Sequence, residues 1–521
     1  MKRRTFMKQM ALTATAAAMA VGCNGVTVEK AKTAPVAKGS GKPNIIFIMA
    51  DDLGYAELGC YGQKKIKTPN IDRLCKAGMK FSDAYSGHAV CAPSRCTLMT
   101  GLHTGHSYVR QNLGTAYAGQ LDIPLDTVTV AKLLKQAGYA TACCGKWGLG
   151  GPGTNGVPWK QGFDEFFGYL DQWRAHTYYS PYLYHNDKQI PQRNGTKFLA
   201  HARIKEPFKT EKEFFDRYAG EDYCTTGMIR TALNFISTNK EEPFFLYYAT
   251  PIPHVSIQAP AEDYKQYKDK FGDKPYLGTK GYLPHPQPRA GYAAMVSHMD
   301  RNVGKIMDLV TELALDDNTL IIFTSDNGPT FNGGSDSTFF ESTPFRGLKC
   351  SLWEGGIRVP FIAKWPGKIK PGSTSNLPTA LWDMMPTFLD AIGEKGLIPK
   401  GIDGLSILPT LTGKGTQKIH DYLYWESGNT KAVRMGKWKG YAKARRAGDS
   451  PVKLYDLAAD PKETKDIAKA NPKVAAKIAK IMIEGRTDSP YFTMGKPSPA
   501  RTEWIKSAKI RAAKLKAGEQ L

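Results

Sequence analysis

Residues 44–52 read Asn-Ile-Ile-Phe-Ile-Met-Ala-Asp-Asp, an apolar run that ends in two carboxylates. A short apolar run bounded by polar residues is typical of a strand that is buried on both faces of a sheet. Four more segments have this character, at 139–144, 244–250, 319–325 and 359–363. We interpret all five segments as strands of a buried parallel sheet.

Helical patterns lie between these strands, at 68–78, 126–137 and 292–310. Strands that alternate with helices predict an α/β fold with a mainly parallel central sheet flanked by helices. The last hundred residues differ, because turn residues there join short β-prone runs at 422–425, 432–434 and 438–441. We expect a smaller C-terminal α+β subdomain with an antiparallel sheet and a basic helical tail from about residue 500.

Four parts of the chain follow from this pattern. We assign residues 1–22 to a signal peptide, 23–42 to a flexible tether, 43–409 to a large α/β domain and 410–521 to the C-terminal subdomain. A basic start followed by a weakly apolar stretch is the architecture of a signal peptide.

The N-terminus predicts export. Arg3-Arg4 lies in a segment that resembles the twin-arginine signal, so the twin-arginine export machinery is an expected partner. Ala20-Val21-Gly22-Cys23 resembles a bacterial lipobox, in which Cys23 would carry a lipid anchor. The alternative is ordinary cleavage and a soluble periplasmic product. We expect a periplasmic protein, or a membrane-anchored lipoprotein that faces the periplasm or the cell surface.

The chain is strongly basic, with 71 Lys and Arg against 48 Asp and Glu and a net charge of +23. Residues 431–521 alone hold 22 basic and 9 acidic side chains. No nucleic-acid recognition module accompanies this charge, and we expect the protein to be exported, so we set nucleic-acid binding aside. The basic C-terminal region either attracts a polyanionic substrate or is only a solvated surface. Nine cysteines are too few for a disulfide scaffold.

Polar groups follow the predicted strands where each one ends. Asp51 and Asp52 follow the first strand, and Asp326 and Asn327 follow the fourth. The carboxyl ends of parallel strands meet at one edge of a sheet, where ligands bind. Three carboxylates and an amide oxygen would repel one another there unless they surround a hard divalent cation. For either pair alone, a turn or a helix cap would be the simpler interpretation.

Residues 91–101 read Cys-Ala-Pro-Ser-Arg-Cys-Thr-Leu-Met-Thr-Gly. This segment resembles the signature of the type I sulfatases, members of the alkaline-phosphatase-like superfamily, whose first signature residue is oxidised to formylglycine (3-oxoalanine). The resemblance extends from residue 44 to about residue 461. It implies a sulfatase whose catalytic domain is 43–409, with Ca²⁺ and formylglycine as cofactors. A formylglycine-generating or an anaerobic sulfatase-maturating enzyme would then be a partner.

The resemblance also implies a role for each matched residue. The calcium ligands would be Asp51, Asp52, Asp326, Asn327 and the modified Cys91. Arg95 would hold the formylglycine, and Lys146 and Lys349 would bind the sulfate. His254 would face the leaving oxygen and donate a proton to it as a general acid.

One position departs from the family pattern. Most type I sulfatases have Gly-Lys-x-His, where the histidine is the base that deprotonates the second hydroxyl of the hydrated aldehyde, but this chain has Gly145-Lys146-Trp147-Gly148. Another group substitutes for the imidazole, or the enzyme is slow or inactive. The candidates for the substitute are His103, His106 and His176.

Residues 168–186 are rich in aromatic and forked polar side chains, which suit a sugar but also suit a packed surface loop. We predict that Gln172, Arg174 and His176, with Arg110, help to select the substrate. The favoured function is hydrolysis of sulfate esters, of sulfated carbohydrate above all. The alternatives are a phosphomonoesterase or phosphodiesterase on the same fold, and a non-catalytic glycan-binding lipoprotein.

Overall fold

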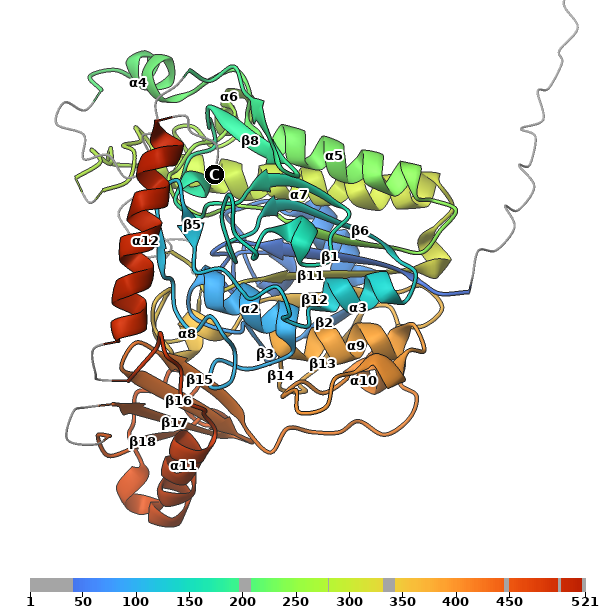
Figure 1. Cartoon of the computed structure of the whole chain (residues 1–521), viewed down its shortest axis with the longest axis vertical. Coiled ribbons are helices and arrows are strands. Elements are labelled where there is room, and N and C mark those ends of the chain that lie inside the picture. Colours follow the sequence, from blue (N-terminus) through green and yellow to red (C-terminus); the bar gives the residue numbers. More distant parts are fainter. Residues whose placement is uncertain are drawn as a thin grey trace, which may run out of the picture. The chain divides into compact units, whose positions relative to one another are not determined.

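A ten-stranded sheet forms the centre of the computed structural model, which describes residues 41–195, 208–279, 281–330, 343–444, 449–494 and 498–517 (Figure 1). The strand order is β13-β2-β12-β11-β1-β10-β6-β7-β8-β9. The five middle strands are parallel: β11 (Thr319–Ser325), β1 (Asn44–Ala50), β10 (Phe244–Ala249), β6 (Ala140–Lys146) and β7 (Glu165–Tyr169). The predicted α/β fold with a mainly parallel sheet is therefore confirmed.

The predicted direction of the fifth strand was wrong. β12 (Phe361–Lys364) pairs antiparallel with β11 and not parallel to it. The reason is that the segment just before β12 lies at the carboxyl edge of the sheet, where Gly328 donates its N–H to the carbonyl of Gly356. A chain that re-enters the sheet from this edge must run backwards. The flanking strands are β2 (Met79–Phe81), β13 (Ser373–Ser375), β8 (Tyr182–His185) and β9 (Lys188–Pro191).

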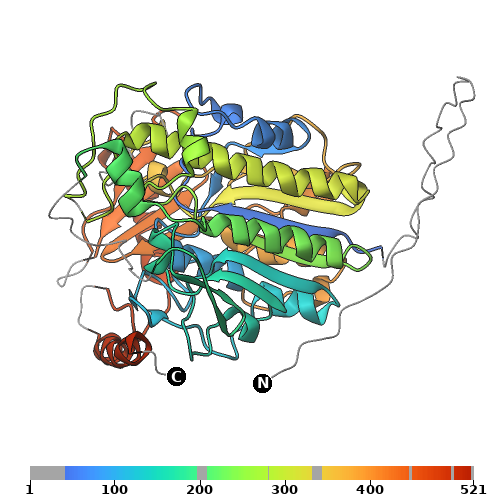
Figure 2. The same ribbon diagram turned by 90° about the horizontal axis from the view of Figure 1, so that it is seen from above.

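Alternate residues of the central strands face two separate cores. Ile46 and Ile48 of β1 pack against α1 (Pro69–Lys76), α5 (Cys224–Thr238) and α7 (Pro288–Glu312). Ile45, Phe47 and Met49 point to the other face, which is covered by α2 (Cys91–Thr100), α3 (Val130–Gln136) and α9 (Met384–Ala391). Figure 2 shows α5 and α7 lying along their face of the sheet. Burial on both faces explains why these strands are continuously apolar.

The helix predictions agree with the structure at 68–78 and 292–310, but the helix predicted at 126–137 begins only at Val130. The Thr129 hydroxyl accepts a hydrogen bond from the Lys132 N–H at 3.2 Å and so caps the helix later than predicted. Leu125 and Val128, which precede the cap, are exposed. The remaining helices and short strands are β3 (Ala84–Tyr85), β4 (Gly114–Thr115), β5 (Gly119–Gln120), β14 (Thr379–Ala380), α4 (Glu211–Tyr218), α6 (Ala261–Lys265), α8 (Glu354–Ile357) and α10 (Leu408–Thr412).

The C-terminal region forms a four-stranded antiparallel sheet, as predicted. Its strands are β15 (Leu423–Ser427), β16 (Thr430–Met435), β17 (Trp438–Lys443) and β18 (Lys453–Asp456). Helix α11 (Pro472–Glu484) covers this sheet with Ile478 and Met482. The last helix, α12 (Pro499–Lys516), leaves the sheet and packs against β4, with Trp504 and Ile505 against the second core. The boundary at residue 410 stays a prediction.

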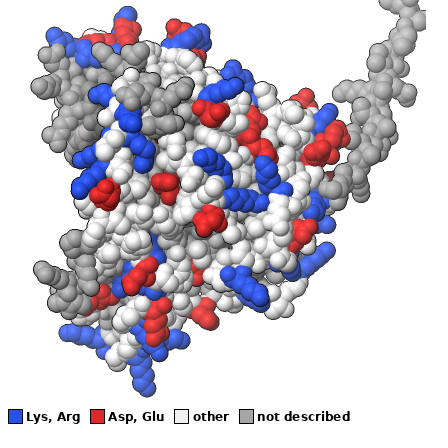
Figure 3. Space-filling model, viewed as in Figure 1, with Lys and Arg blue, Asp and Glu red and all other residues white. Residues whose placement is uncertain are grey.

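The surface charge is mixed on the face that Figure 3 shows, where basic and acidic side chains alternate and do not form one basic patch. No helix among the described residues is long and apolar enough to cross a membrane. The predicted signal peptide, nearly all of the tether, and Cys23 lie outside the described residues.

Candidate active site

The loops after β1 and β11 bring four oxygen-bearing side chains together. Asp51, Asp52, Asp326 and Asn327 are all fully buried. The Asp52 N–H donates to Asp326 Oδ1 at 3.1 Å, and Asn327 Nδ2 donates to Asp52 Oδ1 at 2.7 Å. Asp52 has a φ of 64°, a left-handed conformation that aspartate tolerates better than most residues. The structure therefore brings four of the five predicted metal ligands together in one cluster.

Helix α2 carries two further residues into this cluster. Cys91 is its first residue and is 1% exposed, with its Sγ 3.2 Å from Lys146 Nζ. Arg95 lies one turn later and donates from Nε and Nη2 to Asp326 Oδ2 at 3.2 and 2.8 Å. Its Nη1 donates to the Lys146 carbonyl. Because every residue of α2 is buried, the packing of the helix fixes the place of Cys91.

Two lysines and a histidine complete the charged cluster. Lys146 ends β6 and donates to Asp51 Oδ2 at 2.5 Å. A Cβ on Gly145 would lie 1.9 Å from the Ala249 carbonyl oxygen, so this strand end reaches its place only with glycine there. Lys349 Nζ lies 2.8 Å from Asp52 Oδ2 and 2.7 Å from His254 Nε2. The His254 Nδ1 contacts the Val255 carbonyl, which leaves Nε2 facing the cluster.

The pKa values of these groups are set by two opposing effects: burial disfavours every charged form, and neighbouring opposite charges favour it. Burial alone would raise the pKa of Asp51, but Lys146, His254 and Arg95 hold it below its usual value. Burial and the nearby Asp51 charge raise the pKa of Asp326 to about 7, although Arg95 opposes the rise. Burial raises the pKa of the Cys91 thiol to about 12 and lowers the pKa of His254 to about 3. An unmodified Cys91 would therefore carry a proton, and a thiol is a poor nucleophile.

The donor set fits a hard cation. The Asp51 Oδ1 and Asn327 Oδ1 atoms are buried without a hydrogen-bond partner among the described residues. Ligand atoms of Asp51, Asp52, Cys91 and His254 lie within 4.8 Å of one another. Buried oxygens without partners are costly unless a ligand or an ion binds them, and oxygen-rich sites are typical of Ca²⁺.

A cavity of about 250 Å³ opens onto this cluster. Cys91, His254 and Lys349 lie on its wall, together with Gln172 and His176 from the loop that follows β7. The His176 ring stacks on the His254 ring, with centroids 4.1 Å apart and planes 7° apart. Trp173, from the aromatic segment 168–186, also lines the cavity, but sequence reasoning did not single it out. It missed Asn112 and Tyr282 as well, which lie in loops without a recognisable pattern.

Four of the residues predicted to bind substrate or to substitute for the absent histidine do not line this cavity: Arg174, His103, His106 and Arg110. Arg174 is buried and stacks over the rings of Tyr182 and Tyr117. His103 and His106 stack on each other and face Asp403. Of the three histidines considered as substitutes for the absent imidazole, only His176 therefore lines the cavity among the described residues.

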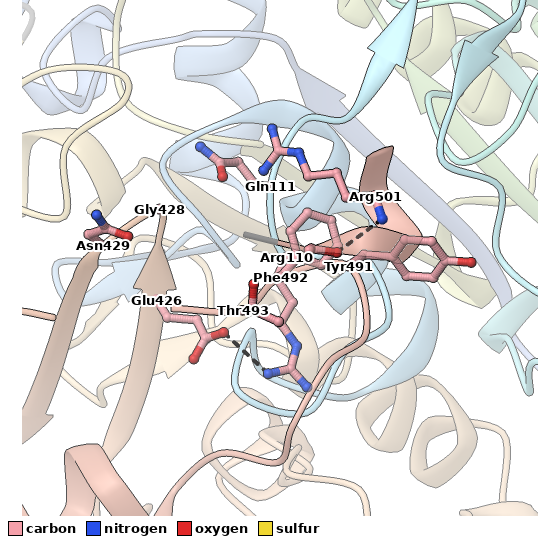
Figure 4. A pocket seen from close by; sticks show the side chains of 10 residues that line it. Arg110, Gln111, Glu426, Gly428, Asn429, Tyr491, Phe492, Thr493 and Arg501 are labelled. Atoms are coloured by element: carbon pink, nitrogen blue, oxygen red, sulfur yellow. Dashed lines mark hydrogen bonds and ion pairs between the residues drawn. The ribbon is translucent and has the colours of Figure 1, made fainter. Parts of the chain in front are cut away.

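Arg110 lines a second pocket, of about 400 Å³, between the large domain and the C-terminal region (Figure 4). It pairs with Glu426 at 3.2 Å and donates to the Thr487 carbonyl at 2.8 Å. Figure 4 shows the Arg501 side chain of α12 beside Gln111 in the same pocket. The structure thus separates Arg110 from the other predicted substrate residues.

Comparison with known proteins gives the same assignment over most of the chain. The Sulfatase family model matches residues 43–394, and the model of the N-sulphoglucosamine sulphohydrolase C-terminal region matches residues 348–487. The chain is 32% identical to an N-acetylgalactosamine-6-O-sulfatase of Bacteroides thetaiotaomicron over 529 residues, covering 90% of this chain and 97% of that protein. It is 32% identical to the N-acetylgalactosamine-6-sulfatase of Homo sapiens over 411 residues, covering 77% of this chain and 71% of that one.

Solved structures share the architecture. The crystal structure of Ps i-CgsB in complex with k-i-k-neocarrahexaose superposes with a TM-score of 0.70 at 30% identity, covering 91% of this chain and 99% of that chain. The phosphonate monoester hydrolase of Agrobacterium radiobacter, at 19% identity and a TM-score of 0.58, shares the fold alone. The family match extends over more than half of the chain and includes the Cys91 segment. The chain therefore belongs to the formylglycine-dependent sulfatases of the alkaline-phosphatase-like superfamily, and it is a sulfuric ester hydrolase.

Proposed function

We propose that the protein hydrolyses sulfate esters of carbohydrate, with a formylglycine made from Cys91 and a Ca²⁺ ion as cofactors. The observation that carries this proposal is the buried cluster around Cys91. Two lysines contact the Cys91 Sγ, and the same lysines and an arginine pair with the buried carboxylates beside it. Asp51, Asp52, Asp326, Asn327 and residue 91 would hold the ion. When bound, the two cofactors supply a nucleophilic oxygen and positive charge beside the sulfuryl group.

The chain's own residues would prepare the sulfate for attack. The ammonium groups of Lys146 and Lys349 lie 3.2 and 4.0 Å from Cys91 Sγ, where they would offset negative charge on the sulfuryl oxygens. The Arg95 guanidinium donates to Asp326 and would hold residue 91 and the ion in fixed positions relative to each other. Fixed charges in a buried site provide the electrostatic share of catalysis without reorganisation.

His254 would protonate the leaving oxygen from Nε2, because its Nδ1 is engaged with the Val255 carbonyl. Its pKa is low in this buried site, and an approaching sulfate ester would raise it by adding negative charge. The stacked ring of His176 would orient the His254 imidazole and border the sugar.

A sugar sulfate suits the cavity. Its wall combines the aromatic Trp173 and Tyr282 with the polar Asn112, Gln172 and His176, and aromatic and polar groups together bind sugars well. Two relatives reported above are named N-acetylgalactosamine 6-sulfatases, and one solved structure is a complex with k-i-k-neocarrahexaose. Arg174 would stabilise the loop that lines the cavity through its contact with the Tyr182 ring. Arg110 would contact only a longer glycan that extends into the second pocket.

The decisive experiment has two parts. Mass spectrometry of the peptide that spans Cys91 should find an aldehyde, made by a formylglycine-generating or anaerobic sulfatase-maturating enzyme. Sulfate release from N-acetylgalactosamine 6-sulfate should exceed phosphate release from the matching phosphate ester. An unmodified thiol in active protein would refute the mechanism. Preferred phosphate release would favour the phosphatase, and binding without turnover would favour the glycan-binding lipoprotein.

Export and anchoring are separate proposals that rest on the N-terminal sequence. We infer that Arg3-Arg4 directs the chain to the twin-arginine machinery and that Cys23 is lipidated. Replacing both arginines with lysine should retain the chain in the cytoplasm, and Cys23→Ala should move the exported protein from the membrane to the soluble fraction. Normal export of the first variant, or unchanged membrane association of the second, would contradict the respective proposal.

A further inference from the structure

Gln172 has an unusual environment for a polar side chain. It is 3% exposed, yet its Oε1 and Nε2 are both buried without a hydrogen-bond partner among the described residues. It lies on the wall of the cavity that contains Cys91 and His254. A buried amide without partners is unfavourable, and native proteins keep one mainly where a ligand or water provides the missing bonds.

The glycine opposite explains why the amide fits. Gly148 has a φ of +83°, and a Cβ at this position would lie 3.0 Å from Gln172 Cγ and 3.1 Å from its Cδ. The Gln172 side chain thus fills the space that a side chain at 148 would need. This is the position where most members of the family carry a histidine and this chain does not.

The backbone on both sides of this contact is held in place. Asp171 accepts hydrogen bonds from the N–H groups of Trp173 at 2.8 Å and Tyr117 at 2.9 Å. Trp147 is fully buried, and its indole N–H donates to the Gly156 carbonyl at 2.6 Å. The residues next to Gln172 and Gly148 are therefore held by their own hydrogen bonds, which keeps the Gln172 side chain on the cavity wall.

We propose that Gln172 recognises a hydroxyl group in the active-site cavity and that it occupies the place of the absent histidine as a neutral positioning residue. The amide offers both a donor group, its NH2, and an acceptor, its oxygen, and together they match a hydroxyl, which also donates and accepts, whereas sulfuryl oxygens only accept. An amide does not titrate near neutral pH, so Gln172 orients a hydroxyl and takes no proton from it. The inference rests on the proposed sulfatase mechanism.

The hydroxyl has two possible sources. One is the sugar, next to the sulfated position, and the other is the second hydroxyl of hydrated residue 91. An aryl sulfate such as 4-nitrophenyl sulfate has no sugar hydroxyl but still requires the hydrate. Comparing a sugar sulfate with an aryl sulfate therefore separates the two sources.

The central variant is Gln172→Met, which keeps the length of the side chain and removes both hydrogen-bonding groups. We expect kcat/KM on N-acetylgalactosamine 6-sulfate to fall about tenfold to a hundredfold. An equal fall on 4-nitrophenyl sulfate would identify the hydrate hydroxyl, and a fall on the sugar alone would identify the sugar hydroxyl. Gln136→Ala, an exposed glutamine at the end of α3, is the matched control.

The melting temperature separates this role from a structural one. Because the amide has no partner to lose, Gln172→Met should melt at or above the wild-type temperature, whereas a structural glutamine would lower it. Gly148→Ala should push the amide aside and reduce activity in the wild type, but add nothing in the Gln172→Met background. Such non-additivity is expected only if the two residues act through one contact.

Binding gives a readout that does not need the modified enzyme. In a Cys91→Ser background, calorimetry with N-acetylgalactosamine 6-sulfate should show weaker binding for Gln172→Met than for Gln136→Ala if the hydroxyl belongs to the sugar, and equal binding if it belongs to the hydrate. Unchanged kcat/KM on both esters within twofold would overturn the inference. A wild-type protein with a thiol at 91 and no sulfate release would instead refute the proposed function, so the two failures are distinguishable.

Discussion

Two buried clusters of charged side chains invite comparison, one around Cys91 and one beneath the C-terminal sheet. In the second, Glu354 of α8 is fully buried, and both of its oxygens have partners: Oε1 accepts from Lys439 at 2.7 Å and Oε2 from the Tyr85 hydroxyl at 2.6 Å. Its backbone N–H donates to Glu463 at 2.7 Å. We call these residues the interface cluster, because they join the large domain to the C-terminal sheet.

The active-site cluster uses the same residue types but leaves acceptors open. Lys146 pairs with Asp51 as Lys439 pairs with Glu354, and both lysines are fully buried. Asp51 nevertheless keeps one oxygen without a partner, as Asn327 does. In the interface cluster both Glu354 oxygens accept hydrogen bonds, and Glu463 Oε1, which accepts none among the described residues, lies 3.6 Å from the Lys439 ammonium. The open oxygens of the active-site cluster belong instead to predicted metal ligands, so they indicate a place for an ion.

The largest effect is expected at residue 91. Cys91→Ala should abolish sulfate release, by at least roughly 10⁴-fold, because it removes the source of the nucleophile. The control is Cys143→Ala in β6, also fully buried but facing the core, which should lose stability and keep turnover per folded molecule. Sulfate release and thermal unfolding measure the two effects. Turnover by Cys91→Ala within tenfold of the wild type would contradict the assignment.

The two buried lysines give the most direct test of the comparison. Lys146→Met should lower kcat by about 10²–10³-fold, because one charge opposite the sulfuryl oxygens is lost. Lys439→Met should instead lower the unfolding free energy by about 3–5 kcal/mol, because Glu354 is left buried without its cation. Urea unfolding and steady-state kinetics on both variants separate these outcomes. Equal losses of stability would remove the distinction between the clusters.

Metal removal should affect only the active-site cluster. Chelation with EDTA should abolish activity and lower the unfolding free energy by about 3 kcal/mol if the ion was present at about 100 times its Kd. Added Ca²⁺ should restore both. An Asp51→Asn/Asp326→Asn variant should show no further shift in melting temperature with EDTA, and a full shift in that variant would place the ion elsewhere.

The interface cluster should respond to acid. Burial alone would raise the pKa of Glu354, but Lys439, Arg358 and Arg434 lower it from 4.5 to about 2. A carboxylate with a lowered folded pKa contributes stability above pH 4.5 and loses that contribution as pH falls toward 2. Between about pH 4.5 and pH 3, wild type should lose roughly 2 kcal/mol more than Glu354→Gln. Parallel stability curves for the two proteins would contradict the prediction.

Exposed charge should behave differently from both buried clusters. Raising salt from about 0.1 to about 1 M shortens the screening length from about 10 to 3 Å, which weakens only solvated interactions. Binding of a sulfated polymer should therefore weaken more than turnover of 4-nitrophenyl sulfate if the basic C-terminal region attracts the substrate. Equal salt responses would mean that this region is only a solvated surface.

The sequence predicts the features of the fold and site that depend on local pattern. The strand before Asp51 and the strand before Asp326 are recognisable from their apolar runs, and parallel topology then brings their ends together. The direction of β12 depends on where the preceding loop lies, which no local pattern records. A similar limit applies to Arg110, whose partner Glu426 is 316 residues away in the chain.

The contact between Gly148 and Gln172 illustrates the same limit at the site. The sequence shows that a histidine is absent at 148, but the residue that fills its space lies 24 positions later, in a loop. Residue type alone suggested three histidines as substitutes for the absent imidazole, but two of them face Asp403 and not the cavity. Shape complementarity and not residue type determines what fills such a space, so only the structure identifies Gln172.

The burial of α2 has a consequence for the order of events in the cell. Every residue from Cys91 to Thr100 is buried, and Cys91 itself is 1% exposed. An enzyme that oxidises Cys91 could not bind this segment in the folded protein, because the whole segment is buried. If Cys91 is oxidised as proposed, the maturation enzyme would have to bind the chain before α2 folds, and the time available for oxidation would end when the helix packs against the sheet.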